Sequence, residues 1–470
     1  MGAWRRYFLP SRSSISVSPT EQPGRRHRLP HQHHRFEWLL AHEWRELLAS
    51  RAFWLLLVMI GPLVGHSFIT AVDTYAEASG AGGGPAALAQ GLSPLDGILV
   101  PTFGAYDLAV TLLFPFVAIR LISADKASGA WKLMEQAPPG LPAILAAKGI
   151  ALLAGWLLAW TPGLLALVLW KAYGGALYAP ELLNLLLGHL LRVILASGIA
   201  VAAAAIATTA ASAAIATLGF TVGTWALDFV GENRGGLLQK LASYTPTSAL
   251  RVFEQGQFRL STVVVEAALG LGGFALAAVW LPLGRKPMAR AAGSAATAAA
   301  LALVLWGSAQ LRPAWDLSEN RRNSFSEAEE AALGKIREPL RVTVFLAPED
   351  PRLIDLDRGI LSKLERILPA VDVQNASHSQ TGLFEGSGDH YGEIWYEMGG
   401  RRVMSRSTTE PIVLGVIFGL ARVEPPAQTG EREYPGHPLA ARPTGAAWIY
   451  YLLLPMVVVA AGWLHFKDRS

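Results

Sequence analysis

The apolar residues of this chain are gathered into long, nearly uninterrupted blocks, and eight of these blocks reach the length of a membrane span. A helix needs about 20 mostly apolar residues to cross the hydrocarbon core of a bilayer. Two of the blocks are rich in alanine, whose small side chain suits close helix packing in lipid. The pattern predicts membrane-spanning helices over 52–72, 98–120, 144–170, 185–207, 211–230, 262–283, 289–310 and 446–465.

A different pattern precedes the first span. Residues 36–50 carry apolar side chains at helical spacing, whereas charged residues such as Glu43 and Arg45 fall off that stripe. An amphipathic helix of this kind is expected to lie in the membrane interface. Residues 1–35 are basic and lack the apolar core of a signal peptide, so we expect a disordered tail, with an organellar transit peptide as the alternative. The apolar stripe consists of Phe36, Leu39, Leu40, Trp44, Leu47 and Leu48.

The segment between the last two spans, 311–444, is predicted to be a small α/β domain. Ser326 and Glu329 have the spacing of a capping box, in which each side chain bonds the backbone of the other at a helix start. Residues 341–346 alternate as a strand does, and Gly399-Gly400 is typical of a hairpin turn. Helices are also expected over 357–368 and 410–422, strands over 371–373, 392–398 and 401–404, and a linker over 424–445.

The composition excludes several classes of protein. Hydrophobic residues make up 52% of the 470 residues and charged residues 16%, and the mean hydropathy is +0.32. A soluble domain is about 25% charged, so this chain is not an ordinary soluble globule. The net charge of +4 is not concentrated on a soluble face, which argues against a nucleic-acid partner. With no cysteine, the chain has no disulfide, thiolate metal site or cysteine nucleophile.

The distribution of lysine and arginine predicts the orientation of the spans. The segments 1–51, 120–148 and 284–290, together with the end of the chain, carry 18 of these residues, whereas the short connections predicted on the opposite side carry five. Because positive residues favour the cytoplasmic side, both termini are expected inside. The predicted fold class is therefore an α-helical polytopic membrane protein of about eight spans in the cell (inner) membrane, with residues 311–444 in a small extracytoplasmic α/β domain.

The chain contains none of the short catalytic motifs that we searched for. It lacks the Gly-x-x-x-x-Gly-Lys-Ser/Thr loop that cradles phosphates, the Gly-x-Ser-x-Gly nucleophile turn and the His-Glu-x-x-His zinc motif. We therefore expect no catalytic residue, no metal site and no cofactor in this chain.

Ionisable residues inside predicted spans are the other candidates for function, because charges are costly in hydrocarbon and usually face a partner or a cavity. Asp107, Arg192 and Asp228 all fall in the outer halves of their spans, so an ion pair between helices is possible. Such a pair could be purely structural, the charges could reach the interface singly, or they could serve substrate passage. Further residues of this kind are His66, His189 and Glu266.

The link between the second and third predicted spans, 121–147, has the most informative local pattern. Gly129 allows a turn, a short apolar helix follows, and Pro138 ends it. Aromatic residues and methionine favour interface cores, so we predict that this link docks a partner, with Trp131 as the anchor. The alternative is that it rests on the membrane with Trp131 among the headgroups. The residues assigned to this site are Asp125, Lys126, Gly129, Trp131, Leu133, Met134 and Pro138.

This link resembles the first cytoplasmic loop of type-2 ABC transporter permeases. In that family the second span runs into an acidic–basic pair, a small-Gly step, an apolar helix, a proline, and a lysine that opens the third span. The same order is found in Asp125, Gly129, Leu133, Pro138 and Lys148. The departure is Ala130-Trp131, where the family usually has threonine and an apolar residue. The interfacial helix and the six spans that follow agree with the family, so the resemblance covers about 36–283.

The remainder, about 290–470, resembles the gliding-motility-type auxiliary component of ABC transporters. The segments 316–326 and 338–346 match the start of that family's extracytoplasmic region, and 391–392 and 454–455 match later points. The domain here is much shorter than is usual in the family. The two resemblances together suggest a permease fused to an auxiliary protein, with a six-span permease domain over 51–283.

These resemblances imply the permease subunit of an ABC transporter, energised by a separate cytoplasmic ATPase subunit that holds ATP and magnesium. The implied partners are that ATPase, a second permease in a homo- or heterodimer, and membrane lipid, with no nucleic acid. The alternative is a non-transporting membrane scaffold that anchors an extracytoplasmic binding domain. A membrane-embedded enzyme is a third hypothesis, which would need convergent polar residues that the sequence does not reveal.

Overall fold

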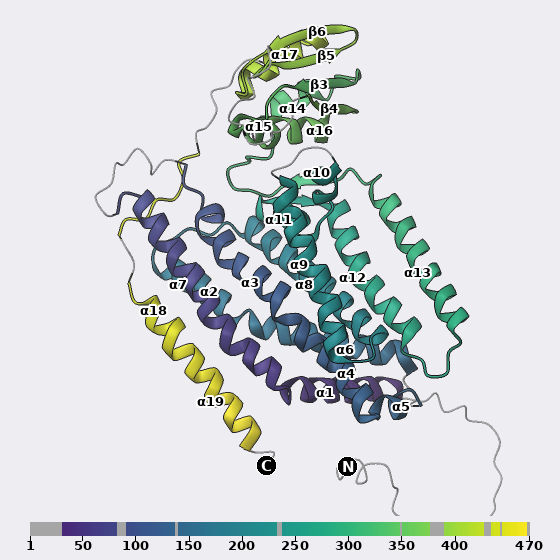
Figure 1. Ribbon diagram of the computed structural model, residues 1–470. Coiled ribbons are helices and arrows are strands. Elements are labelled where there is room, and N and C mark those ends of the chain that lie inside the picture. The colour runs from purple at the N-terminus through teal and green to yellow at the C-terminus, as the bar shows by residue number, and fades with distance from the viewer. Residues whose placement is uncertain are drawn as a thin grey trace, which may run out of the picture.

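The computed structural model describes residues 31–81, 91–136, 140–232, 237–347, 350–376, 390–426, 434–441 and 444–467. A bundle of long helices carries a small domain at one end, and the helix α1, His31–Leu48, lies across the opposite end (Figure 1). We refer to these as the domain end and the α1 end of the bundle. The helix α19, Leu454–Lys467, also finishes at the α1 end (Figure 1).

Each of the eight predicted spans corresponds to a helix, or a chain of short helices, that is long and apolar enough to cross a membrane. Two are broken in the middle, where Pro115 and Pro162 begin a new helical segment because proline cannot donate to the preceding turn. The spans are α2 Arg51–Ala78; η3 Leu95–Leu99 with α3 Val100–Leu112 and α4 Phe114–Ser128; α6 Gly140–Ala159 with α7 Thr161–Ala172; α8 Ala179–Ile206; α9 Ala210–Glu232; α12 Leu260–Trp280; α13 Pro287–Ser308; and α18 Ala446–Trp448 with η5 Ile449–Leu453 and α19.

Shorter helices cover the two ends of the bundle. At the α1 end, α1 packs on α6 and leaves Trp38 70% exposed while Leu47 is buried, as its predicted amphipathic stripe requires. The five-residue helix α5, Ala130–Met134, lies at the same end (Figure 1). At the domain end are α10, Leu237–Ala242, and α11, Pro246–Glu254.

The domain has the predicted α/β character. Its four-stranded sheet has the order β4-β3-β5-β6, with β3 and β4 parallel and the other neighbours antiparallel. The capping box of Ser326 and Glu329 is confirmed, and the Gly399-Gly400 turn joins β5 to β6 with both φ angles positive. The elements are α14 Glu327–Leu333, β3 Leu340–Val344, α15 Pro351–Leu356, η4 Asp357–Leu361, α16 Ser362–Ile367, β4 Val371–Asn375, β5 Ile394–Met398, β6 Arg401–Ser405 and α17 Glu410–Ala421.

A two-stranded ribbon that the sequence analysis missed joins the domain to the bundle. Strand β1, Gln257–Arg259, precedes α12, and it pairs antiparallel with β2, Ala314–Asp316, which follows α13. The ribbon holds together the ends of two neighbouring spans at the point where the chain leaves the bundle for the domain.

Glycines allow the closest helix crossing in the bundle, between α8 and α12. A Cβ atom added to Gly198 would lie 2.0 Å from the Gly270 carbonyl oxygen, and one added to Gly273 would lie 2.3 Å from the Gly198 backbone. Helices in lipid associate through close backbone packing of this kind, because burial of apolar surface gains little there. The two helices also have the largest mutual contact of any pair in the described chain.

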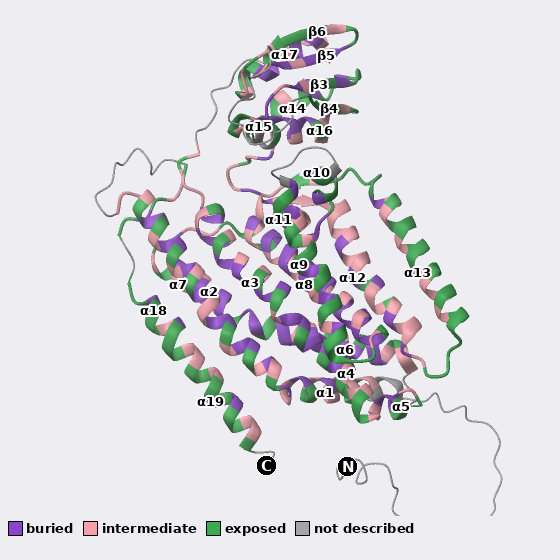
Figure 2. Ribbon diagram, viewed as in Figure 1, coloured by how far each residue is buried: buried purple, intermediate pink, exposed green. Residues whose placement is uncertain are grey.

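The last two spans lie on opposite flanks of the other six (Figure 1). The helix α13 packs on α12, where the Trp280 indole donates to Ser294 Oγ at 3.0 Å. The helix α19 and the turn before it pack on α2, where Gly61 and Gly65 make room for Leu454 and Tyr450. Both flanking spans are mostly exposed, in contrast to α8 (Figure 2).

The α8–α12 crossing leads to a test of the bundle. Gly198→Val should push the two helices apart, and overpacking of this kind costs about 1–3 kcal/mol. We expect a clear fall in the thermal unfolding midpoint of the full chain in mild detergent. Gly223→Val in α9 is the matched control, because a Cβ atom there has no neighbour within 4 Å. Equal midpoints for the two variants would contradict the crossing.

Candidate functional site

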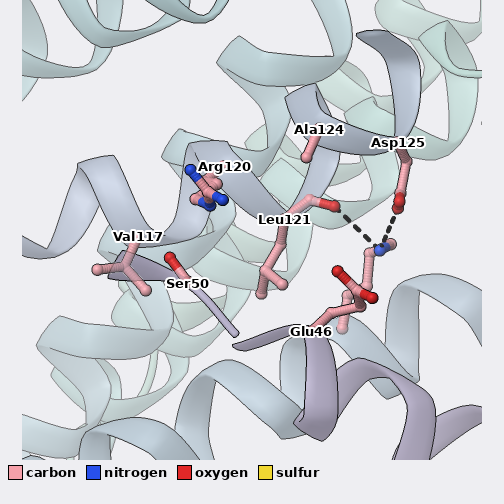
Figure 3. Close-up of a pocket in the computed structure, with 8 residues that line it drawn as sticks. Glu46, Ser50, Val117, Arg120, Leu121, Ala124 and Asp125 are labelled. Carbon is pink, nitrogen blue, oxygen red and sulfur yellow. Dashed lines mark hydrogen bonds and ion pairs between the residues drawn. The ribbon is translucent and has the colours of Figure 1, made fainter. Parts of the chain in front are cut away.

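A buried lysine joins three helices at the α1 end. The Lys148 ammonium, on α6, donates to Glu43 Oε2 of α1 at 2.7 Å and to Asp125 Oδ2 of α4 at 2.6 Å. Its third donor reaches the Leu121 carbonyl oxygen at 3.0 Å. The dashed lines in Figure 3 mark the bonds to Asp125 and Leu121. All three protons of the ammonium are therefore used, and they fix α1 and α4 against the middle of α6.

This cluster contains one more negative than positive group. Lys148 and Glu43 are only 1% and 0% exposed. Burial raises the pKa of Glu43 above its ordinary value, and the charge and hydrogen bond of Lys148 act in the opposite direction. A cavity of about 30 Å³ beside the cluster is lined by Ser50 and Arg120 as well as Asp125 (Figure 3). That volume is enough for a water molecule, which needs about 10–15 Å³.

The residues after Asp125 are bonded to the ends of two further spans. The Lys126 ammonium donates to the carbonyl oxygens of Ala204, Ala205 and Ala207, at 2.9, 3.2 and 2.7 Å. These carbonyls lie at the carboxyl end of α8, where a helix has no partners of its own and where a positive charge is favourable. Lys126 therefore caps α8.

The α12 span is held in a similar way. The Trp131 indole donates to the Leu281 carbonyl oxygen at 3.1 Å, and Glu135 Oε1 accepts from the Leu283 amide at 3.1 Å. Leu281 directly follows α12. The segment 125–136 thus makes polar bonds to α6 and to the ends of α8 and α12. It is linked to α1 only indirectly, because Lys148 also bonds Glu43.

The structure gives the local geometry of the residues predicted to dock a partner, and it corrects the placement of one of them. Gly129 makes the predicted turn, with φ of 77°, and Leu133 is 59% exposed. Trp131 is only 3% exposed and Met134 7%, because both side chains pack into the bundle. The expectation of Trp131 as an exposed anchor, at a protein interface or among lipid headgroups, is therefore wrong. Pro138 lies outside the described residues.

A second charged cluster lies inside the bundle. Arg192 Nε of α8 donates to Asp107 Oδ1 of α3 at 2.8 Å, and its Nη2 reaches Thr111 Oγ1 at 3.3 Å. The Arg192 and Asp107 side chains are 3% and 15% exposed. Thr111 also binds the next span, because its carbonyl oxygen accepts from Thr221 Oγ1 of α9 at 3.0 Å. Of the three residues considered for an ion pair between helices, Asp107 and Arg192 form one.

Asp228 does not join that pair. It lies near the domain end of α9, where its carboxylate pairs with Arg251 of α11 and accepts from Thr245 Oγ1 at 3.1 Å. Thr245 also caps α11 by accepting from the Ser248 amide. Arg251 lies in a connection outside the spans, where its residue type and position do not mark it as a partner of Asp228. Asp228 thus fixes the short helix α11 and is not part of the Asp107–Arg192 pair.

Other buried polar residues complete the second cluster. Glu266 of α12 and His189 of α8 are 4% and 1% exposed. Within the described residues, His189 Nε2 has no hydrogen-bond partner. Both residues were noted in the sequence as ionisable groups inside spans, but their assembly around one arginine depends on the packing of α8 against α12 and α3.

Glu43 is the site residue that the sequence analysis missed. It was placed on the polar side of the amphipathic helix, where an exposed glutamate is ordinary. The available signal was its charge complementarity with Lys148, a lone cation at the start of an apolar span. Comparison of the chain with protein families, curated proteins and solved structures finds no match. The geometry alone therefore describes a cluster at the α1 end that mechanically joins α1, α4 and α6, with its neighbours capping α8 and α12.

Removal of the central cation should destabilise the bundle strongly. Lys148→Met leaves two carboxylates without their shared partner, and breaking a buried ion pair costs about 3–5 kcal/mol. A carboxyl group such as Glu43, whose pKa is raised on folding, binds more protons folded than unfolded, so it favours the folded state as the pH falls. The stability gap between Lys148→Met and the wild type should be smaller at pH 5 than at pH 8.

Thermal unfolding of the full chain in detergent at the two pH values measures this gap. Lys132→Met is the matched control, because Lys132 lies in the same segment and is exposed. A Lys148→Met variant as stable as the control at pH 8 would contradict the central role of the ammonium.

Proposed function

We propose that this chain is the membrane permease subunit of an ABC transporter, energised by a separate cytoplasmic ATPase subunit. The observation that carries the proposal is the set of polar bonds from residues 125–136 to α6 and to the ends of α8 and α12, with α1 linked through Lys148. A force applied to this segment would act on several spans at once. A coupling element between an ATPase and a membrane bundle needs that property.

The proposed ATPase contact is the part of this segment that faces away from the bundle. Its exposed residues include Ser128, Lys132 and Leu133. Leu133 supplies the apolar contact that Trp131, being buried, does not. The chain has no phosphate-binding loop, so ATP and magnesium belong to the partner. The resemblance to type-2 permeases further implies a homo- or heterodimer of permeases.

We propose that the α1 end faces the cytoplasm and that the domain end lies outside the cell membrane. The excess of lysine and arginine in the segments at the α1 end supports this orientation. The domain would then be the extracytoplasmic auxiliary part, similar in kind to the gliding-motility-type component but shorter. Its four-stranded sheet suits a binding role.

The ATPase contact leads to a test by co-purification from native membranes in mild detergent. Leu133→Asp places a charge in the proposed apolar contact. Truncation of an interface anchor commonly costs about 2 kcal/mol, roughly 30-fold in affinity. We expect the wild-type chain to retain an ATPase subunit and the Leu133→Asp variant to lose most of the co-purifying ATPase. The wild type and the variant should be equally stable.

The matched control is Met288→Asp, an 85% exposed apolar residue at the same end of the bundle but outside the segment. This variant should retain the ATPase. If the wild-type chain itself yields no ATPase, the chain is not an ABC permease and the scaffold hypothesis is favoured. If Leu133→Asp retains the ATPase as Met288→Asp does, the contact is misplaced.

The orientation can be tested because the chain has no cysteine of its own. Glu327→Cys introduces a thiol on α14 of the domain, where the side chain is 88% exposed. Ser128→Cys introduces one at the α1 end, where the residue is exposed. An impermeant maleimide should label only the first variant in intact cells and both after permeabilisation. The reverse pattern would overturn the orientation.

A further inference from the structure

A cavity of about 400 Å³ lies where the domain meets the bundle. It is bounded by the β1–β2 ribbon, by the residues that follow α13, and by the end of α16 with the turn into β4. Figure 1 places α16 above the ends of α12 and α13. The size is that of a typical small-ligand site, about 300–1,000 Å³. The polar and aromatic residues that matter below are Arg259, Arg312, Arg366, Ser261 and Trp315.

The cavity lies at the level where two spans end. Arg259 directly precedes α12, and Arg312 follows the end of α13 by four residues. Trp315 is 53% exposed, and its ring lies 5.5 Å from that of Phe258 on the paired strand. Tryptophan and arginine at the ends of spans are typical of the layer in which lipid headgroups lie. The cavity therefore faces the headgroup layer.

Three guanidinium groups and two acids line this cavity, and one of the three, Arg366, is paired with Glu330 outside the lining. Asp316 accepts from Ser318 and Asn323 through both of its oxygens, so it is engaged in the turn after β2. Glu365 faces Arg259 and offsets part of its charge. The net charge of the lining is positive.

The guanidinium groups also retain unused donors. Arg259 Nε donates to Gln257 Oε1 at 2.9 Å. Arg366 pairs with Glu330, but its buried Nε has no partner in the described part of the chain. No described residue bonds to the Arg312 guanidinium. Planar guanidinium groups with free donors match the oxygens of a phosphate.

An apolar path leads from the cavity along the last turns of α13. Leu311 lines the cavity and is 37% exposed, and Leu303 and Trp306 on α13 are each 67% exposed. A ligand with a phosphate in the cavity could therefore lay an acyl chain against α13. Free phosphate would make no use of this surface.

We propose that this cavity binds the phosphate-bearing headgroup of an anionic membrane amphiphile, with the guanidinium groups on the phosphate and the acyl chain along α13. Ser261 supplies a further hydroxyl donor for the headgroup. The site belongs to the chain itself and does not depend on whether the chain serves a transporter.

The test uses the full chain in detergent and native mass spectrometry during titration with phosphatidylglycerol. We expect one saturable molecule to bind, and phosphatidylcholine, which has no net charge, to bind far more weakly. Arg312→Gln and Arg259→Gln should each weaken phosphatidylglycerol binding about tenfold, because each removes a charge-assisted hydrogen bond to the phosphate. Since Arg312 is exposed and makes no described bond, its replacement should leave the unfolding midpoint unchanged.

The matched control is Arg321→Gln, a 71% exposed arginine paired with Glu327 outside the cavity. It should bind phosphatidylglycerol as the wild type does. Equal binding by the wild type, Arg312→Gln and Arg259→Gln would indicate lipid bound elsewhere on the bundle and would overturn the proposal. Inorganic phosphate alone, tested at the same concentrations, should not displace the amphiphile. Displacement by phosphate at similar affinity would assign the site to a free anion instead.

Discussion

The architecture at the α1 end depends on one ammonium group that is shielded from water. Lys148 satisfies all three of its donors with Glu43, Asp125 and the Leu121 carbonyl. A cation at the start of an apolar span has no other stabilising partner, and each carboxylate alone would be costly to bury. The amphipathic helix, the second span and the third span are therefore held together by a constraint on charge as well as by apolar packing.

The segment 125–136 is fixed by bonds to Lys148 and to the ends of α8 and α12. Lys126 and Trp131 satisfy the terminal carbonyls of α8 and α12, two helices that are themselves locked by Gly198, Gly270 and Gly273. Because a glycine crossing has little freedom to slide, a displacement of the segment would move α8 and α12 together. The Asp107–Arg192 pair joins α3 to the same unit deeper in the bundle. The charged residues thus lie at the contacts between helices that pack as one body.

The sequence predicted best those features that arise from the pattern of apolar residues within one continuous segment. Eight spans, the amphipathic helix and the elements of the domain follow from runs and periods of apolar residues, which one-dimensional patterns record directly. The burial of Trp131 and the pairing of Asp228 with Arg251 do not follow, because each depends on which distant segment packs beside it. The same is true of the β1–β2 ribbon, whose strands are only three residues long and lie about 55 residues apart. The sequence could mark Asp107 and Arg192 as candidates for an ion pair because both are charged residues inside predicted spans. It could not mark Arg251 as the partner of Asp228, because Arg251 lies outside the spans.

The packing of the last span against the first has a consequence for the order of assembly. His66 Nδ1 and the Tyr451 hydroxyl oxygen lie 3.1 Å apart, although the two residues are separated by 385 positions in the chain. During synthesis the surface of α2 around Gly61 and Gly65 is completed only when the final span arrives, after the domain has been made. The return segment must also reach α2, since the Leu439 amide donates to Ser79 Oγ and the Tyr75 hydroxyl to the His437 carbonyl. The first span to be synthesised is therefore among the last to reach its native surroundings, and a ribosome-bound chain lacking α19 would leave a glycine groove open to lipid.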